Sequence, residues 1–574
     1  MKLQSSIISA LFVLFLLSNC VAQTVTENIR INQIGFFVDG IKKAVAIDFA
    51  ESKFEVWKSD QSEKVFSGNL IKKAKWESSG EDNIQIADFS SLKKEGTYIV
   101  IIGSMKSFPF QISNTVLDEV TKAQMKFYYF NRCSYELLPK YAGKWARPAG
   151  HLNTSVKVYE DQSRNISMSG GWYDAGDFGL YMVTGSIAAC ELMMSYEQFS
   201  DYWNKTECNI PESANGVPDI LDEVKYELKW MYKMKDTDNG VWYKNTSTHH
   251  SGVVMPDKET SQFYCMVKNA TSAYDYAATF AIAARVFKKF NKQYPGFSDS
   301  CLTAAQSAWT WGVANETTHP FCRNPKGVYT GDYGDSIVQS GNDNKVLAGA
   351  ELFITTGDSA YVKPILHAAQ IGFDNEYGEP NWIEKRPLAT IELAIRGDKK
   401  CRENVLKYAD KQLQLIANSS YNVNIGITPD DFGWGSNRRV SERSIAMSAA
   451  FVLTKDSKYI QGVTDAMDYI LGRNATGYCF ITGFGSKRVM NPHHRVSGAD
   501  GVLEPVPGLP IQGPYNGAVG DPCRPQVLSP FAAKNYYDHD CSYVTNEQCI
   551  DEGSAHIFNL SALMQYLGNS TLKK

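Results

Sequence analysis

The sequence predicts a multidomain protein in which an all-β sandwich is followed by a large all-α domain. Three observations support this fold class. Residues from about 28 to 114 form short β-branched runs, and after about residue 116 the pattern changes to long helices. The chain has 574 residues, whereas single hydrophobic cores stop growing at about 250 to 300 residues. At least two domains are therefore expected.

The first 22 residues have the layout of a secretory signal peptide. Lys2 is followed by an apolar run over residues 7–17 and then by small or polar residues up to Ala22. We therefore expect a secreted or periplasmic protein. Cys20 leaves an alternative open, in which it is the lipid-modified residue that anchors a bacterial lipoprotein. No later stretch approaches the ~20 uninterrupted apolar residues of a transmembrane helix.

Residues 23–113 are predicted to form the β-sandwich. Partly alternating β-branched runs are separated by Gly, Ser, Asp and Lys, a pattern typical of short antiparallel strands. The runs cover residues 29–32, 43–48, 54–57, 83–87, 97–102 and 108–112. None of them carries a cluster of residues that indicates catalysis.

Residues 114–574 are predicted to form the all-α domain. Apolar residues recur every three or four positions, so each helix has a face to bury. The clearest patterns cover residues 220–232, 277–290, 348–354, 446–453 and 557–567. So many helices favour a closed toroid of helix pairs over a simple bundle, because a toroid gathers its loops at one end, where a cleft can form.

The composition excludes some partners. Hydrophobic residues make up 43% and charged residues 21%, and the net charge is only −4, so neither nucleic acid nor an anionic membrane is an expected partner. The 11 Trp and 31 Tyr fit either a large core or a surface that stacks on flat apolar faces.

The cysteines after residue 22 are dispersed, without a Cys-x-x-Cys pair. They are expected to be buried small apolar residues, with at least one free thiol because their number is odd.

The segment Gly170-Gly-Trp-Tyr-Asp-Ala-Gly-Asp-Phe-Gly places Asp174 and Asp177 three residues apart among glycines. Two adjacent carboxylates resist simultaneous ionisation, which favours acid or base chemistry on a water molecule. Taken alone, the segment is also compatible with a loop cap or a calcium-binding turn.

Two later segments add chemistry. Tyr536-Tyr-Asp-His-Asp-Cys-Ser-Tyr-Val-Thr-Asn-Glu presents Glu547 among aromatic residues, and Asn491-Pro-His-His-Arg supplies His493 and Arg495. Two adjacent histidines are weak evidence for a metal site. Hydrogen-bond donors to sugar hydroxyls are the better interpretation.

These three segments, in this order, resemble glycoside hydrolase family 9. The likeness covers nearly the whole chain, because further matching segments begin at Asn32, Pro211, Trp434 and Tyr469. The resemblance implies an immunoglobulin-like domain followed by an (α/α)6 barrel. It also implies inverting, endo-acting hydrolysis of β-1,4-glucosidic bonds in cellulose, mixed-linkage glucan, xyloglucan or glucomannan.

By the same resemblance, Asp177 is the base that activates water, Asp174 helps to hold that water, and Glu547 is the acid that protonates the leaving oxygen. His493 and Arg495 contact the sugar next to the cut. Tyr173, Trp434 and Tyr543, which lie in or beside these motifs, are expected to contact substrate as well.

No cofactor is expected to be required. Some relatives bind zinc through a Cys corresponding to Cys133 and a later Cys-His pair, but here the pair is Gly150-His151, so zinc is not expected. A calcium site of the family uses Ser-Gly followed by Asp-Glu. Here Ser340-Gly-Asn-Asp-Asn lacks the Glu, which leaves a structural calcium ion open.

Three other functions remain to be separated from this one. An exo-acting glucosidase or glucosaminidase would use Glu552, which stands where many relatives carry an aromatic residue, to meet an amine. A carbohydrate-binding protein that has lost catalysis would not need all three carboxylates. A lyase with a helical barrel would use a Tyr or His residue as its base and would not need two paired aspartates, so the pair Asp174 and Asp177 argues against a lyase. We expect a monomer whose partner is a β-glucan, with a sandwich that supports the barrel and binds no polysaccharide.

Overall fold

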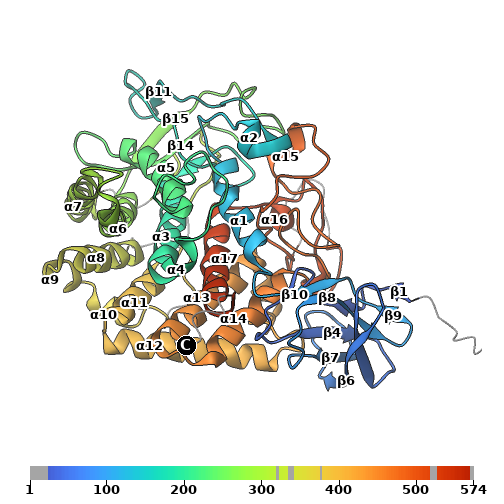
Figure 1. The fold of residues 1–574 in the computed structure, drawn as a ribbon. Coiled ribbons are helices and arrows are strands. Elements are labelled where there is room, and N and C mark those ends of the chain that lie inside the picture. The colour runs from blue at the N-terminus through green and yellow to red at the C-terminus, as the bar shows by residue number, and fades with distance from the viewer. Residues whose placement is uncertain (1–22, 319–321, 334–341, 375–377, 518–526, 569–574) are drawn as a thin grey trace, which may run out of the picture.

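A computed structural model of the chain describes residues 23–318, 322–333, 342–374, 378–517 and 527–568. A β domain packs against one side of a larger helical domain (Figure 1). The predicted signal peptide with Cys20 lies outside the described residues, as do Ser340 and Gly341 of the calcium segment.

The β domain contains two layers joined by one long strand. The first half of β6 pairs with β5 and its second half pairs with β7, so β6 passes from one layer to the other. The strands are β1 (Thr24–Val25), β2 (Ile29–Arg30), β3 (Gly35–Phe36), β4 (Lys43–Ile47), β5 (Lys53–Lys58), β6 (Lys64–Lys73), β7 (Ile84–Asp88), β8 (Gly96–Ile102), β9 (Met105–Lys106) and β10 (Phe110–Ile112). Between the layers, Phe36 packs edge-on against Phe89 and Phe110, with ring centroids 5.4 Å apart in both pairs.

The helical domain begins with α1 and ends with α17. Its helices are α1 (Asp118–Phe130), α2 (Pro139–Ala142), α3 (Met182–Gln198), α4 (Ser200–Trp203), α5 (Asp219–Lys233), α6 (Ala270–Phe287), α7 (Phe297–Asn315), α8 (Asn342–Thr356), α9 (Ser359–Val362), α10 (Leu366–Gln370), α11 (Arg386–Ile395), α12 (Lys399–Asn418), α13 (Ser436–Thr454), α14 (Ser457–Ile470), α15 (Arg495–Ala499), α16 (Tyr543–Asn546) and α17 (Ile550–Leu563).

Six helix pairs close into a ring. The inner helices α3, α6, α8, α11, α13 and α17 contact one another in that order and return to α3, and α1, α5, α7, α10, α12 and α14 lie outside them. The predicted toroid is thus an (α/α)6 barrel, preceded by the expected immunoglobulin-like sandwich.

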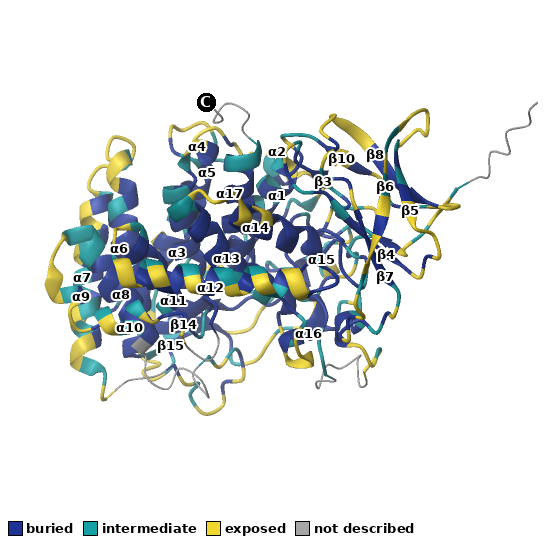
Figure 2. Ribbon diagram, turned by 90° about the horizontal axis from the view of Figure 1, so that it is seen from below, coloured by how far each residue is buried: buried dark blue, intermediate teal, exposed yellow. Residues whose placement is uncertain are grey.

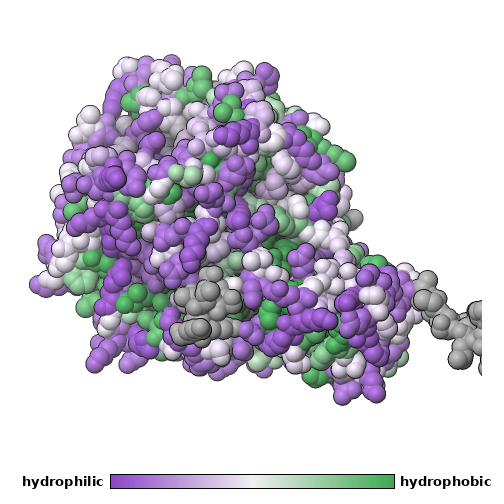
Figure 3. Space-filling view, in the orientation of Figure 1, coloured by the Kyte–Doolittle hydropathy of each residue, from purple (hydrophilic) through white to green (hydrophobic). Residues whose placement is uncertain are grey.

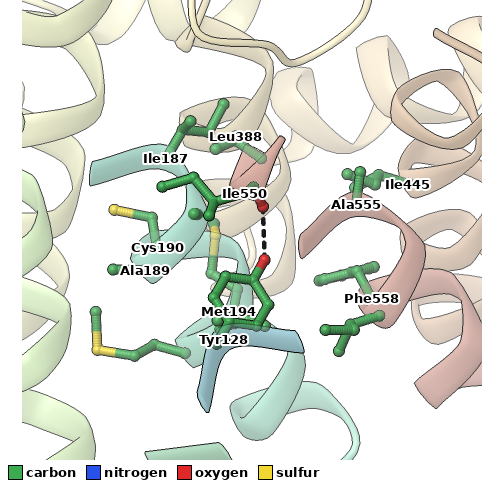
Figure 4. Close-up of a cluster of buried hydrophobic side chains, with 14 of the residues drawn as sticks. Tyr128, Ile187, Ala189, Cys190, Met194, Leu388, Ile445, Ile550, Ala555 and Phe558 are labelled. Carbon is green, nitrogen blue, oxygen red and sulfur yellow. Dashed lines mark hydrogen bonds between the residues drawn. The ribbon is translucent and has the colours of Figure 1, made fainter. Parts of the chain in front are cut away.

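The sequence explains which helices lie inside. Every residue of α17 is buried, and most of its side chains are small or apolar, with Asp551, Glu552, His556 and Asn559 as exceptions. By contrast, α12 alternates between buried and exposed positions along its length (Figure 2). In the interior, Tyr128 of α1 donates a hydrogen bond to the carbonyl oxygen of Ile550 at 2.5 Å, among apolar side chains of α3 and α17 (Figure 4).

A five-stranded sheet, which the sequence analysis did not predict, lies among the loops of the barrel. Its strands are β11 (Val156–Val158), β12 (Asn165–Ile166), β13 (Leu180–Tyr181), β14 (Trp242–Thr246) and β15 (Tyr264–Lys268), in the order β12-β11-β15-β14-β13. Because β13 leads directly into α3, the sheet fixes the start of that inner helix.

Most cysteines of the described residues have the packing role that the sequence predicts. Nine cysteines are buried and free, as a packing role predicts, whereas Cys541 is disulfide-bonded. No helix among the described residues is long and apolar enough to cross a membrane. The face shown in Figure 3 is mainly hydrophilic, with small separate apolar areas.

Candidate active site

The segment that carries both aspartates runs from Gly170 into β13 and contacts the C-terminal part of the chain. A Cβ atom at Gly176 would lie 2.0 Å from the carbonyl oxygen of His493, so only glycine allows this close approach. The backbone N–H of Arg495 donates to the carbonyl oxygen of Gly176 at 3.1 Å, and that of Ile550 donates to Asp174 at 2.9 Å. These contacts close the barrel and bring the segment with Asp174 and Asp177 next to the segments with His493 and Glu547, which lie more than 300 residues later in the sequence.

A cavity of about 850 Å³ lies beside the first residues of several inner helices. All three predicted catalytic carboxyl groups line it. The wall also includes Tyr181, Thr184, His250, Gly331, Asp332, Tyr333, Glu379, Trp382, Trp434, Arg438, Arg439, Glu442, His493, Arg495, Tyr543, Cys549 and Asp551.

Asp177 has a cationic environment. Its Oδ2 lies 3.0 Å from Nδ1 of His250, and its Oδ1 accepts the backbone N–H of Gly179 at 3.2 Å. Burial alone would raise the pKa of Asp177. The hydrogen bond from His250, together with the positive charges of His250 and Arg495, outweighs it and lowers the pKa to about 2. The carboxylate is therefore ionised.

Asp174 is held by two hydroxyl groups. Thr184 and Tyr333 donate to its two oxygens, the latter at 2.8 Å. Burial and the negative charge of Asp177 raise the pKa of Asp174 to about 8. At neutral pH Asp174 is thus mainly protonated beside an ionised Asp177.

Glu547 faces the same loop from the other side. Its Oε1 accepts the backbone N–H of Gly176 at 3.2 Å. Its backbone carbonyl accepts the N–H of Gln512 at 3.1 Å, and it forms a bridge with His493. Burial, followed by the charge of Asp177, raises the pKa of Glu547 well above its usual range. Burial therefore favours the protonated form of Glu547, the form that a general acid needs.

His493 and Arg495 lie where the motif predicts, at the cavity wall. The Nδ1 of His493 bonds to the carbonyl oxygen of Asp540, which fixes the ring. Arg495 donates through Nε to the carbonyl oxygen of Ser251 at 2.9 Å, and its buried Nη1 has no hydrogen-bond partner. Both residues line the cavity and carry N–H donors.

Two of the three aromatic expectations agree with the cavity, and one is wrong. Trp434, half exposed, and Tyr543 line the wall with ring centroids 5.3 Å apart. Tyr173 does not line it. Its side chain is buried, and its hydroxyl group shares a 2.8 Å hydrogen bond with His151. Tyr173 is therefore a core residue, whereas the adjacent Asp174 lines the cavity.

Comparison with known proteins decides the family. The model described as "Glycosyl hydrolase family 9" matches residues 118–560, and the model described as "Cellulase N-terminal ig-like domain" matches residues 24–107. The chain belongs to glycosyl hydrolase family 9. It is a glycoside hydrolase.

Relatives of this family 9 enzyme match over almost their whole length. The xyloglucan-specific endo-beta-1,4-glucanase BoGH9A of Bacteroides ovatus is 32% identical, over 94% of each chain. A cellodextrinase of Butyrivibrio fibrisolvens is 29% identical, over 94% of this chain and 100% of its own.

Solved structures of relatives have the same fold. The Bacteroides ovatus GH9 structure has a TM-score of 0.86 at 30% identity, covering 95% of this chain and 100% of its own. A single mutant of the thermostable endoglucanase from Alicyclobacillus acidocaldarius has a TM-score of 0.85 at 27% identity, covering 94% and 100%.

The surroundings of Cys133 do not fit zinc. Burial raises the pKa of the Cys133 thiol to about 11, and the Nδ1 of His151 is bonded to Tyr173. Among the described residues, the single group of three candidate ligands is His539, Asp540 and Cys541, and Cys541 is disulfide-bonded. A structural zinc ion needs four ligands. A zinc-binding triple mutant is known for the relative endoglucanase J30, and the absence of zinc here stays a prediction.

The described part of the calcium segment is also a poor fit. Asn344 donates its amide to Asp275 at 2.6 Å, and Asp343 accepts the backbone N–H of Lys385 at 3.3 Å. Lys345 forms an ion pair with Glu316. Calcium takes six to eight oxygen ligands, whereas the described residues of this segment offer one carboxylate, that of Asp343, and an amide whose N–H group is directed to Asp275.

Sequence reasoning missed several cavity residues. His250 lies in an irregular loop without a motif, and Tyr333 and Trp382 come from loops whose position depends on the closed barrel. Only the adjacent pair His249-His250 was a signal in the sequence. Glu552 is fully buried on α17 and does not line the cavity, so the expectation that it meets an amine is wrong.

Proposed function

We propose that this family 9 enzyme hydrolyses β-1,4-glucans by an endo-acting, inverting mechanism, with Asp177 as general base and Glu547 as general acid. One observation carries the assignment. Two carboxyl groups at one cavity wall contact the backbone of the same loop, yet their pKa values are shifted in opposite directions. Direct hydrolysis needs one carboxylate and one carboxylic acid.

Asp177 supplies the base. A water molecule beside it attacks the anomeric carbon, and the proton of that water passes to the carboxylate. The contacts with His250 and Gly179 hold both oxygens of Asp177 in place. Asp174, protonated and fixed by Thr184 and Tyr333, assists by holding the water.

Glu547 supplies the acid. As the glycosidic bond breaks, its electron pair stays on the leaving oxygen, which takes the proton of Glu547. A protonated carboxyl group near neutral pH is what this step requires. After each turnover Asp177 gives a proton to solvent and Glu547 takes one up.

The remaining wall binds sugar. Trp434, half exposed, and Tyr543 present aromatic faces to pyranose rings, while His493 and Arg495 donate to hydroxyl groups. Together with all three carboxyl groups, this wall favours a catalyst over a binding protein that has lost catalysis. We also propose that the enzyme is secreted and monomeric.

The test is a product analysis. Proton NMR of the first products from a soluble β-1,4-glucan is expected to show α-configured reducing ends, because the water attacks the face opposite the leaving group. A rapid fall in viscosity relative to the release of reducing ends would demonstrate endo action. Early β-anomers, or a sugar covalently bound to either aspartate, would contradict the assignment. The panel should include xyloglucan, since the relative from Bacteroides ovatus is named for that substrate.

A further inference from the structure

An exposed pair of rings lies on two neighbouring loops that lead to residues of the cavity wall. Tyr329 is 68% exposed, and His249 beside it is exposed as well. Their ring centroids are 4.8 Å apart, with the ring planes inclined at 41°. We call Tyr329 and His249 the rim pair.

The rim pair is held by its backbone. The N–H of Tyr329 donates to the carbonyl oxygen of Thr248 at 2.8 Å, which joins the two loops. One residue further on, Thr330 donates to the carbonyl oxygen of Ser247 at 3.0 Å, and Lys244 donates to the carbonyl oxygen of Thr330 at 2.6 Å. A surface fixed in this way loses little conformational freedom when a ligand binds.

Both loops of the rim pair lead into the cavity. His250, the residue after His249, lines the cavity and contacts Asp177. On the other loop, Gly331 and Asp332 line the cavity two and three residues after Tyr329. His249 and Tyr329 therefore stand one and two residues before the wall of the active site.

We propose that the rim pair is an outer binding site for a sugar unit of the β-glucan chain that extends out of the cavity. This inference rests on the proposed function, because it assumes a polymeric β-glucan substrate. An exposed tyrosine ring presents a flat apolar face that packs against the C–H face of a pyranose ring, and its hydroxyl group stays in water. The site adds affinity for long chains and none for chains short enough to lie within the cavity.

The experiment compares a long soluble β-1,4-glucan with cellotetraose. For Tyr329→Ala, KM on the polymer is expected to rise about 2- to 10-fold, in line with one aromatic contact, and to rise relative to KM on cellotetraose. Tyr329→Phe keeps the ring and is expected to restore the wild-type ratio. His249→Ala gives a smaller change in the same direction, because it removes the support of the tyrosine ring.

Trp57→Ala is the control, since Trp57 lies on β5 and its indole N–H is bonded to Glu55 at 2.7 Å within the β domain. If Tyr329→Ala and Tyr329→Phe have the same KM on the polymer, the inference is wrong. An equal loss on polymer and cellotetraose would show a structural role and also overturn it. A wild-type enzyme that cleaves no β-1,4-glucan would instead contradict the proposed function.

Discussion

Single residues around the cavity decide which carboxyl group holds a proton. Burial raises the pKa of both groups, but at Asp177 the hydrogen bond from His250 and the charge of Arg495 outweigh it, whereas Glu547 has the anion Asp177 nearby and accepts a single backbone N–H. The charge of Asp177 also raises the pKa of Asp174. Burial and, after it, this one negative charge raise the pKa values of both neighbouring carboxyl groups.

Replacing the general acid is expected to impair protonation of the leaving oxygen without impairing the activation of water. Glu547→Gln cannot donate a proton to the leaving oxygen, so turnover of natural glucans should fall by about 10²- to 10⁴-fold while substrate binding is retained. Aryl glycosides with good leaving groups should lose much less, because they need little protonation. Asp177→Ala is the matched comparison and should lose activity on both. Steady-state rates on both substrates test this, and equal losses for Glu547→Gln would be evidence against its role.

The contact with His250 leads to a prediction about pH. kcat/KM falls below the pKa of Asp177, because a protonated base takes no proton from water, and falls above the pKa of Glu547, because an ionised acid donates none. His250→Gln removes a hydrogen bond and a charge that lower the pKa of Asp177 from its usual range to about 2. The acidic limb should therefore move to higher pH, and the basic limb should move little. His249→Gln is the control, and an unmoved acidic limb in His250→Gln would count against this function of the contact.

At the scale of the elements, the sequence predicts buried helices better than exposed strands. Strong apolar periodicity marked α5, α6, α8, α13 and α17. β6 was missed because Ser67, Gly68 and Asn69 interrupt a mostly exposed strand. The sheet of β11 to β15 was missed because its strands are short and pair across long stretches of sequence.

Site residues that depend on contacts between distant segments were also hard to predict from the sequence. Asp174, Asp177 and Glu547 could be predicted as site residues because they stand in motifs, and all three line one cavity of the barrel. Tyr173 was wrongly placed because the motif does not show which of two adjacent side chains points inward. His250 and Tyr333 could not be found, since their contacts with the aspartates depend on how the loops fold.

The start of α13 carries a buried ion pair that should dominate local stability. Arg438 lies 2.9 Å from Asp551 of α17 and 3.4 Å from Glu442. Arg438→Ala removes the cation that faces the carboxyl groups of Asp551 and Glu442 and should lower the free energy of unfolding by up to about 3 kcal/mol, less than a fully buried pair would, because all three side chains line the cavity. The control is Lys458→Ala, since Lys458 and Asp410 form an exposed pair that should contribute less than about 1 kcal/mol. Urea denaturation measures the free energy of unfolding of both variants. Equal losses would show that the Arg438 ion pair contributes no more to stability than an exposed pair.

At the scale of the whole molecule, the β domain supports a wall of the cavity. Trp76 is buried at the domain junction, with its ring 4.8 Å from that of Tyr421 and 6.2 Å from that of Phe432. A Cβ atom at Gly426 would lie 2.4 Å from its indole, so the loop packs closely on it. Two residues after Phe432 stands Trp434, which lines the cavity.

Trp76→Ala should therefore affect both stability and substrate binding, although Trp76 contacts no substrate. Truncation of a buried tryptophan typically costs about 3 to 5 kcal/mol, so the unfolding temperature should fall. The loop of residues 426–434 loses its support, and KM for β-glucan should rise because Trp434 is less well positioned. Trp57→Ala, at a position within the β domain, should change neither KM nor kcat. Thermal unfolding and initial rates, measured on both variants, test the argument. If Trp76→Ala lowered the unfolding temperature but left KM unchanged below that temperature, the β domain would stabilise the barrel without shaping its cavity.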